Sequence, residues 1–140
     1  MAKRKTLSYH VFLPQGVSVP GYNSLELTGR TEAVSRREAV SHLIARQLSR
    51  ERDKIALIMN ELDINHGGAE NYAFSQQEPP EILQDIENLK KGSKLTLYEK
   101  KLLREQAFAY NLARLDEVDT SNPETQMHYI EKARFLMKKH

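Results

Sequence analysis

The sequence predicts an α+β fold in which helices dominate: an N-terminal two-stranded β-ribbon is followed by four to five helices. Two observations lead to this prediction. A segment near the N-terminus places large side chains at every second residue from Leu7 to Leu13, the period of two that is typical of a strand. Three later Ser/Thr-x-x-Glu patterns, each followed by apolar residues at helical spacing, mark the starts of helices. The 140 residues match the size of a single domain.

The β-ribbon is predicted over residues 6–28. Its first strand covers 6–13 and is expected to be half-buried, because one face carries a row of large side chains: Leu7, Tyr9, Val11 and Leu13. Its second strand is predicted over Ser24–Thr28, with Leu25 and Leu27 facing inward. Two strands alone are only marginally stable, so the ribbon is expected to pack on the helices or on another chain.

The first helical region is predicted over 35–62, either as one long helix or as two helices with a bend near residue 50. The apolar period lapses at that point and resumes with Ile55. A polar linker without secondary structure is expected over 63–80, attached to the core by Tyr72 and Phe74.

Three further helices are predicted at 81–91, 97–116 and 122–139. Pro80 precedes the first of them and Gly92 follows it, as is usual at helix boundaries. The three expected N-terminal capping boxes begin at Ser35, Thr96 and Ser121.

Composition limits the classes of function. The chain has no cysteine, which excludes disulfides, thiolate metal sites and a cysteine nucleophile. No apolar run has the ~18 residues of a membrane span, and the basic N-terminus is not followed by the apolar block of a signal peptide. We therefore expect no membrane association and a cytoplasmic location. No two of the five histidines lie at i, i+4 on one helix, so neither a metal nor another cofactor is predicted.

The net charge of +2 hides a strong segregation along the chain. Residues 1–54 and 90–104 together hold 16 of the 21 basic residues, whereas residues 55–89 hold seven acids and no Lys or Arg. Cations clustered in this way can displace the counterions of a phosphate backbone, although they can also form ion pairs within the protein. The sequence favours a small, non-enzymatic accessory protein that binds nucleic acid or a nucleoprotein. The residues expected at that interface are Lys3, Arg4, Lys5, Arg36, Arg37, Arg46, Arg50, Arg52, Lys90, Lys91, Lys94, Lys100, Lys101 and Arg104.

An alternative from a different class is a protein-binding adaptor or inhibitor with no nucleic-acid contact. The acidic block over 55–89 and the aromatic residues Tyr72 and Phe74 are its candidate contacts. A homodimer belongs to the same class of partner.

A minor alternative is enzymatic. The spacing Arg37-x4-His42, on a predicted helix, resembles the Arg-x(4–6)-His element of the HEPN ribonucleases, small helical proteins whose Arg and His act on the scissile phosphate. The resemblance covers six residues and implies an Arg/His-dependent ribonuclease. Similar spacings occur at Arg4/His10, Arg36/His42 and Arg134/His140, and no single pair is preferred. No catalytic residue is assigned.

Overall fold

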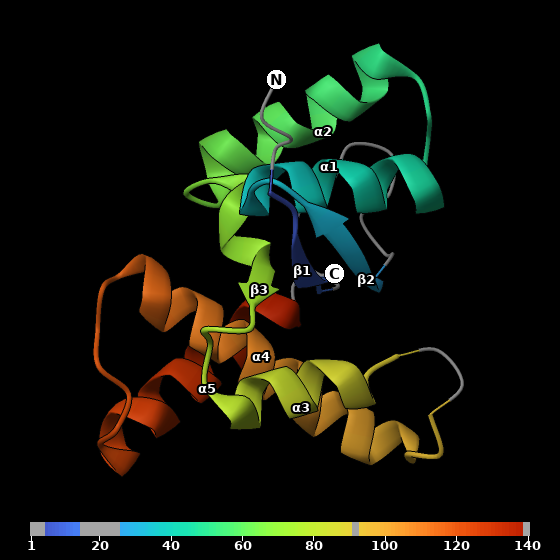
Figure 1. The fold of residues 1–140 in the computed structure, drawn as a ribbon. Helices are drawn as coiled ribbons and strands as arrows, with labels where there is room; N and C mark the ends of the chain where they lie inside the picture. Colours follow the sequence, from blue (N-terminus) through green and yellow to red (C-terminus); the bar gives the residue numbers. More distant parts are fainter. Residues whose placement is uncertain (1–4, 15–25, 91–92, 139–140) are drawn as a thin grey trace.

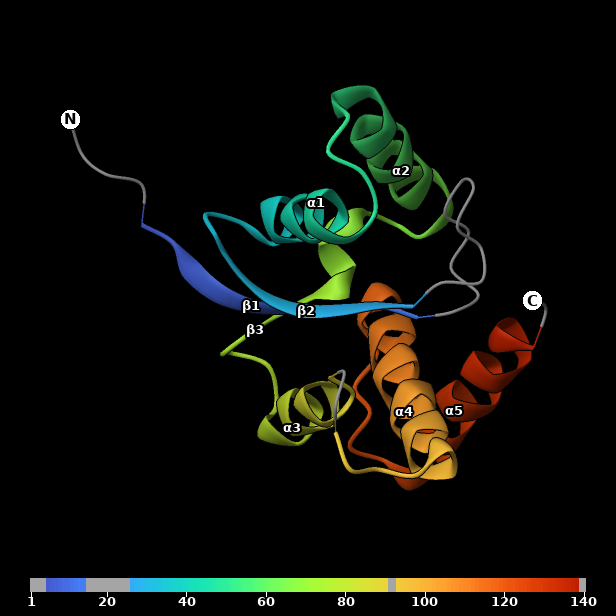
Figure 2. The same ribbon diagram turned by 90° about the vertical axis from the view of Figure 1, so that its right-hand side faces the viewer.

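A three-stranded antiparallel sheet lies between two layers of helices (Figures 1 and 2). This computed structural model describes residues 5–14, 26–90 and 93–138. The strands are β1 (Leu7–Leu13), β2 (Leu27–Ala33) and β3 (Ala73–Ser75), arranged in the order β2-β1-β3. The predicted class, α+β with helices dominant, is confirmed.

Two helices cover one face of the sheet and three cover the other. Figure 2 shows α1 directly on the sheet with α2 outside it, and α3, α4 and α5 on the opposite side. The helices are α1 (Arg36–Gln47), α2 (Arg52–Asn65), the 3-10 helix η1 (Ala69–Tyr72), α3 (Pro80–Asn88), α4 (Leu97–Leu115) and α5 (Pro123–Met137). The region predicted at 35–62 is therefore a pair of helices, and the break between them lies at the expected bend.

The prediction that one face of β1 is buried is confirmed for Tyr9, Val11 and Leu13, but Leu7 is 51% exposed and Phe12, from the other face, is buried as well. Tyr9, Val11 and Leu13 lie in a core with α1, and Phe12, from the other face, is fully buried with residues of α3 and α4. Helices pack on both faces of β1, with α1 on one face and α3 on the other. The predicted ribbon is therefore packed on helices of the same chain, one of the two arrangements expected from the sequence.

The second strand begins and ends later than predicted. Ser24 and Leu25 lie outside the described residues, and β2 runs from Leu27 to Ala33, through a stretch that was expected to be a connection. Its buried face carries the small residues Thr31 and Ala33, so an apolar alternation is hard to see in the sequence. A Cβ on Gly29 would lie 2.7 Å from Leu43 Cδ1, which shows how closely α1 approaches this strand.

Side chains of α1 occupy backbone acceptors on β2. Gln47 Nε2 donates to the carbonyl oxygen of Thr28 at 3.1 Å, and Arg46 Nη1 donates to that of Arg30 at 3.0 Å. Among the described strands β2 pairs with β1 alone, so it is an edge strand. The helix therefore also binds the edge of the sheet.

The expected linker contains structure. α2 continues to Asn65, and η1 and the short strand β3 follow within the range predicted as a linker. Tyr72, at the end of η1, and Phe74, on β3, are both buried, as predicted. Phe74 is held there by the pairing of β3 with β1 at His10↔Phe74. A strand of three residues is too short for its sequence period to be recognised.

Two of the three predicted N-terminal caps are present, and the one at Thr96 is a complete capping box. Ser35 Oγ accepts a hydrogen bond from the Glu38 amide, and Thr96 and Glu99 form a complete capping box. The predicted cap at Ser121 is wrong, because the Asn122 side chain takes that role and accepts from the Glu124 amide. Asn is as good an N-cap as Ser, so neighbouring candidates compete.

Candidate nucleic-acid interface

The structure separates the predicted phosphate-binding residues into paired and unpaired groups. Lys3, Arg4 and Lys91 lie outside the described residues. Of the others, four side chains are held by carboxylates of the same chain: Arg36, Arg37, Lys90 and Arg104. For these four, the intramolecular pairing that the sequence left open as an alternative is the one observed.

Arg36 lies in a largely buried polar cluster instead of at an open surface. Its Nη1 is 2.5 Å from Glu78 Oε1 and also donates to the carbonyl oxygen of Ala73 at 2.6 Å. Arg114 Nη1 donates to the same Glu78 oxygen at 2.7 Å, and the Tyr110 hydroxyl donates to the other one. One carboxylate, whose side chain is only 8% exposed, therefore joins α1 to α4.

This cluster shifts the ionisation of its members. Burial alone would raise the pKa of Glu78, but the hydroxyl of Tyr110 and the guanidinium groups of Arg114 and Arg36 outweigh burial and lower it. Burial and the bond to Glu78 together raise the pKa of Tyr110 to about 12. Glu78 is therefore ionised and Tyr110 protonated at neutral pH, as expected of a structural ion cluster.

Two of the remaining paired cations are bound at exposed positions, and the third, Arg104, is partly buried with its carboxylate. Arg37 donates two hydrogen bonds, of 2.5 and 2.6 Å, to Asp63, and this ion pair connects α1 to α2. Lys90 Nζ lies 2.5 Å from Glu87, and Arg104 is bonded to Glu26. Each carboxylate reduces what its partner can offer to a phosphate.

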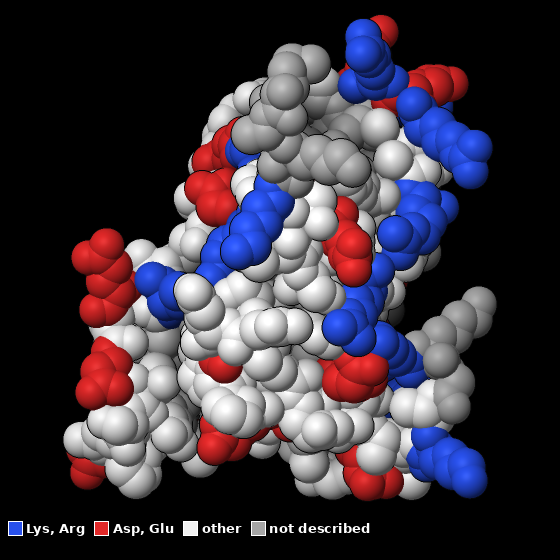
Figure 3. Space-filling model, in the orientation of Figure 1, with Lys and Arg blue, Asp and Glu red and all other residues white. Residues whose placement is uncertain are grey.

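The second group consists of cations that form no ion pair with a carboxylate of the described residues. Figure 3 shows many Lys and Arg side chains in a column along the right-hand side of the view, over the α1–α2 corner, β2 and the approach to α4. Acidic groups flank it, and more of them gather on the left. We call the unpaired cations carried by these elements the basic column: Arg30 on β2, Arg46 on α1, Arg50 and Arg52 at the α1–α2 corner, Lys94 just before α4 and Lys100 in its first turn. The sequence singled out all of these except Arg30.

The two basic blocks of the sequence meet at the sheet. Arg30 stands opposite His10 in the β1–β2 register, and the charges of Arg30 and Lys90 both act on His10. Just before β2, burial raises the pKa of Glu26, and the positive charges of Arg104 and Lys100 partly oppose this rise. Glu87 lies 3.1 Å from His10 Nδ1 and 2.5 Å from Lys90 Nζ, and Arg104 is bonded to Glu26. Residues 1–54 and 90–104 therefore meet at these two places although an acidic block separates them in sequence.

His10 is the titratable group between these blocks. Its Nδ1 lies 3.1 Å from Glu87 Oε2. Burial lowers the pKa of His10; Glu87 partly opposes this effect, while Arg30 and Lys90 add to it. His10 is therefore mainly neutral at pH 7 and does not add to the positive charge of the column.

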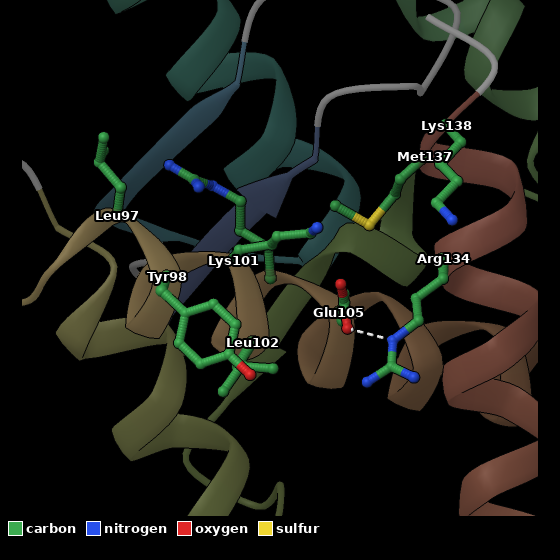
Figure 4. Close-up of a pocket in the computed structure, with 9 residues that line it drawn as sticks. Leu97, Tyr98, Lys101, Leu102, Glu105, Arg134, Met137 and Lys138 are labelled. Atoms are coloured by element: carbon green, nitrogen blue, oxygen red, sulfur yellow. Dashed lines mark hydrogen bonds and ion pairs between the residues drawn. The ribbon is translucent and has the colours of Figure 1, made fainter.

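A pocket of about 520 Å³ opens between the first turns of α4 and the end of α5 (Figure 4). The residues that line it are Leu97, Tyr98, Lys101, Leu102, Arg104, Glu105, Arg134, Met137 and Lys138. Arg134 Nε donates to the buried Glu105 at 2.6 Å, the contact drawn as a dashed line. Four cations and one carboxylate line this pocket, which we call the α4–α5 pocket. Arg104 connects it to the neighbourhood of Glu26 and Lys100.

The interface predicted from the sequence includes Lys101 and Arg104 of this pocket but not Tyr98, Arg134 or Lys138, and Arg134 was considered only for its spacing to His140. Tyr98 was read only as part of a capping box. A usable signal was present, because Leu97 and Tyr98 add two large apolar side chains ahead of the buried stripe of the helix. Nothing in the sequence indicated that the end of α5 would face the start of α4, because that depends on how the two helices cross.

In the Arg/His spacing that resembles a ribonuclease element, the two side chains contact different carboxylates. Arg37 is bound to Asp63, whereas His42 Nε2 lies 3.2 Å from Glu38 on its own helix. Arg4 and His140 lie outside the described residues. Within the described ranges, no group of three or more His, Asp or Glu residues is arranged to hold a metal ion. None of the helices there is long and apolar enough to span a membrane.

Comparison with known proteins adds no assignment. No protein-family model matches this chain, and neither the search of curated proteins nor that of solved structures gave a match.

Proposed function

We propose that this protein is a non-enzymatic accessory protein that binds nucleic acid, or a nucleoprotein, through the basic column. The observation that supports this most directly is the meeting of the two basic blocks on one side of the molecule, with six cations that no described carboxylate pairs. Unpaired cations in a row can replace the counterions of a phosphate backbone. The cytoplasmic location predicted from the sequence belongs to this proposal.

The paired cations narrow the proposed interface. Arg36 and Arg37 are removed from it, since their guanidinium groups are bound to Glu78 and Asp63. Arg50 and Arg52, at the α1–α2 corner, are exposed and make no ion pair with a described residue, so they are the best single test positions. Lys5 is also exposed.

The test compares binding by two variants that change the net charge equally. Arg50→Gln with Arg52→Gln removes two charges from the column, and Lys132→Glu changes the charge by the same amount on α5, where Lys132 faces Asp116. Binding of a labelled oligonucleotide is measured between about 50 and 200 mM salt. The double variant should lose affinity on the order of ten-fold at low salt, with a salt slope shallower by about two. The α5 control should bind much more like the wild type.

Equal losses in the two variants would show that only net charge matters, and the column would lose its role. Absence of binding to duplex and single strands at low salt would remove the proposal altogether, because phosphate contacts are strongest there.

A second candidate is the protein-binding adaptor or inhibitor, and one feature of α2 favours it. Leu57 and Ile64 are 56% and 68% exposed and lie seven residues apart, hence on one face of the helix. Tyr72 and Phe74, the aromatic contacts considered from sequence, are buried and are not available. A partner helix would fit such a face.

This second candidate predicts that Leu57→Asp abolishes capture of a protein partner from nuclease-treated host extract while circular dichroism stays unchanged. Glu61→Lys, on the same helix, tests for a purely electrostatic contact. Capture that disappears entirely on nuclease treatment of the wild type would count against the adaptor.

A further inference from the structure

The α4–α5 pocket has apolar walls that phosphate contacts alone do not require. Leu97 and Tyr98 are 83% and 69% exposed at its mouth, and Leu102 and Met137 line it further in. Figure 4 shows Leu97 and Tyr98 at the start of α4, with Met137 and Lys138 on α5 across the pocket. Adjacent exposed apolar side chains of this size, rimmed by polar groups, are typical of interaction sites.

The polar groups of the pocket favour an anion. Lys101 and Lys138 form no ion pair with any described carboxylate, and Arg104 is already bonded to Glu26. Glu105, the one acid in the lining, is buried and bonded to Arg134 through Nε, so it fixes that side chain in place. A ligand therefore meets positive charge on both helices, with apolar surface between them.

We propose that the α4–α5 pocket binds an unpaired segment of single-stranded nucleic acid, with a base stacked on Tyr98 and the flanking phosphates at Lys101 and Lys138. This inference rests on the proposed function and specifies its substrate class. Aromatic rings and cations in alternation are how proteins hold single strands, because every base has a stacking face and every nucleotide a phosphate. Bases within a duplex are already stacked on one another and cannot reach the ring.

The size and place of the pocket agree with this ligand. Its volume of about 520 Å³ lies in the range of small-ligand pockets. Arg104, in its lining, is also next to the Glu26 and Lys100 end of the basic column, so a strand can run from the column into the pocket. The column then supplies affinity for any phosphate backbone, and Tyr98 supplies the preference for unpaired bases.

The experiment measures binding of the full chain to three labelled oligonucleotides of equal length: a single strand, the same strand with abasic sites, and the duplex. The variants are Tyr98→Ala and Tyr98→Phe. Loss of one stacked base should weaken single-strand binding by Tyr98→Ala roughly 5- to 100-fold, with the salt slope unchanged. Tyr98→Phe should bind like the wild type, because it keeps the ring. Tyr98→Ala should leave duplex and abasic binding as they were.

The outcomes distinguish the two proposals. Binding to all three oligonucleotides with no effect of Tyr98→Ala overturns the pocket inference and leaves the basic column in place. Equal weakening of duplex and single strand by Tyr98→Ala also overturns it. No binding of any oligonucleotide overturns both proposals. Tyr98-dependent binding of poly-glutamate as tight as that of the single strand would assign the pocket to an acidic peptide instead.

Discussion

The arginines at opposite ends of α1 are used in opposite ways. Arg36, the first residue of the helix, is bound to Glu78 together with Arg114, largely out of water. Arg50 and Arg52, just beyond the other end, are exposed and pair with no described carboxylate. The same residue type holds the fold together at one end and is free to meet a ligand at the other. The presence of a carboxylate partner within the fold, and not the count of arginines, separates the two roles.

Substitutions in the Glu78 cluster and at Arg50 and Arg52 should also differ in how much they lower the free energy of unfolding. Removing one partner from a buried ion cluster leaves uncompensated charge away from water, whereas an exposed cation loses little when it is replaced. Stability and nucleic-acid binding should therefore respond to different substitutions. The predictions below use that separation, beginning with the largest effect.

The largest expected effect is that of Glu78→Gln. This substitution keeps the shape of the side chain but leaves Arg36 and Arg114 without their common carboxylate, so the free energy of unfolding should fall by about 3–5 kcal/mol. Urea denaturation followed by circular dichroism measures it. Glu81→Gln, at an exposed position on α3, is the matched control and should change it by less than about 0.5 kcal/mol. Equal effects of the two substitutions would mean that the buried cluster does not stabilise the fold.

A smaller effect should appear with pH at the junction of the basic blocks. Burial lowers the pKa of His10 below its ordinary 6.5, so the unfolded chain binds the proton more readily than the folded one. The stability that this contributes is present above pH 6.5 and is lost as the pH falls through the folded pKa. His66, whose pKa is also lowered by burial, acts in the same direction.

We therefore expect the free energy of unfolding to decrease from pH 7.5 to 5.5, and to decrease less in a His10→Gln variant. Urea denaturation at both pH values measures the difference. An identical decrease in the variant and the wild type would show that His10 is not the responsible group. Glu78 does not account for this change, because its pKa lies below the ordinary value of a glutamate. Its stabilisation is present throughout this pH range and is lost only on further acidification, below that ordinary value.

The smallest effect on stability should come from the basic column itself. Arg50→Gln with Arg52→Gln should shift the free energy of unfolding by less than about 0.5 kcal/mol, since both side chains are exposed. The same variant is expected to weaken nucleic-acid binding strongly. A large loss of stability in this variant would show that the two ends of α1 do not differ as described.

Local features of the fold could be predicted from the sequence, and long-range ones could not. The starts of α1 and α4 were recognisable because Ser35 and Thr96 act on amides three residues away. β2 was placed too early because its buried face is built from small side chains such as Thr31. β3 has only three residues, too few to show the alternation of side chains that identifies a strand in a sequence.

The candidate site shows the same division. The sequence located both basic blocks, because charge segregation is visible residue by residue. It could not tell that Arg36 would meet Glu78, or that Arg134 would reach the start of α4, since those contacts depend on the packing of distant elements. Tyr98 lay within a recognised capping box, but a cap explains only the backbone and polar groups of that turn and not an exposed ring.

The hydrogen bonds from α1 to β2 have a consequence for behaviour at high concentration. An edge strand with free backbone groups can recruit a strand from another molecule and start aggregation. Here Gln47 and Arg46 occupy two of the carbonyl oxygens that an incoming strand needs, at Thr28 and Arg30. A foreign strand must first displace side chains of a helix that is anchored in the core. These two side chains should therefore oppose the pairing of β2 with a strand of another molecule, for as long as α1 stays packed on the sheet.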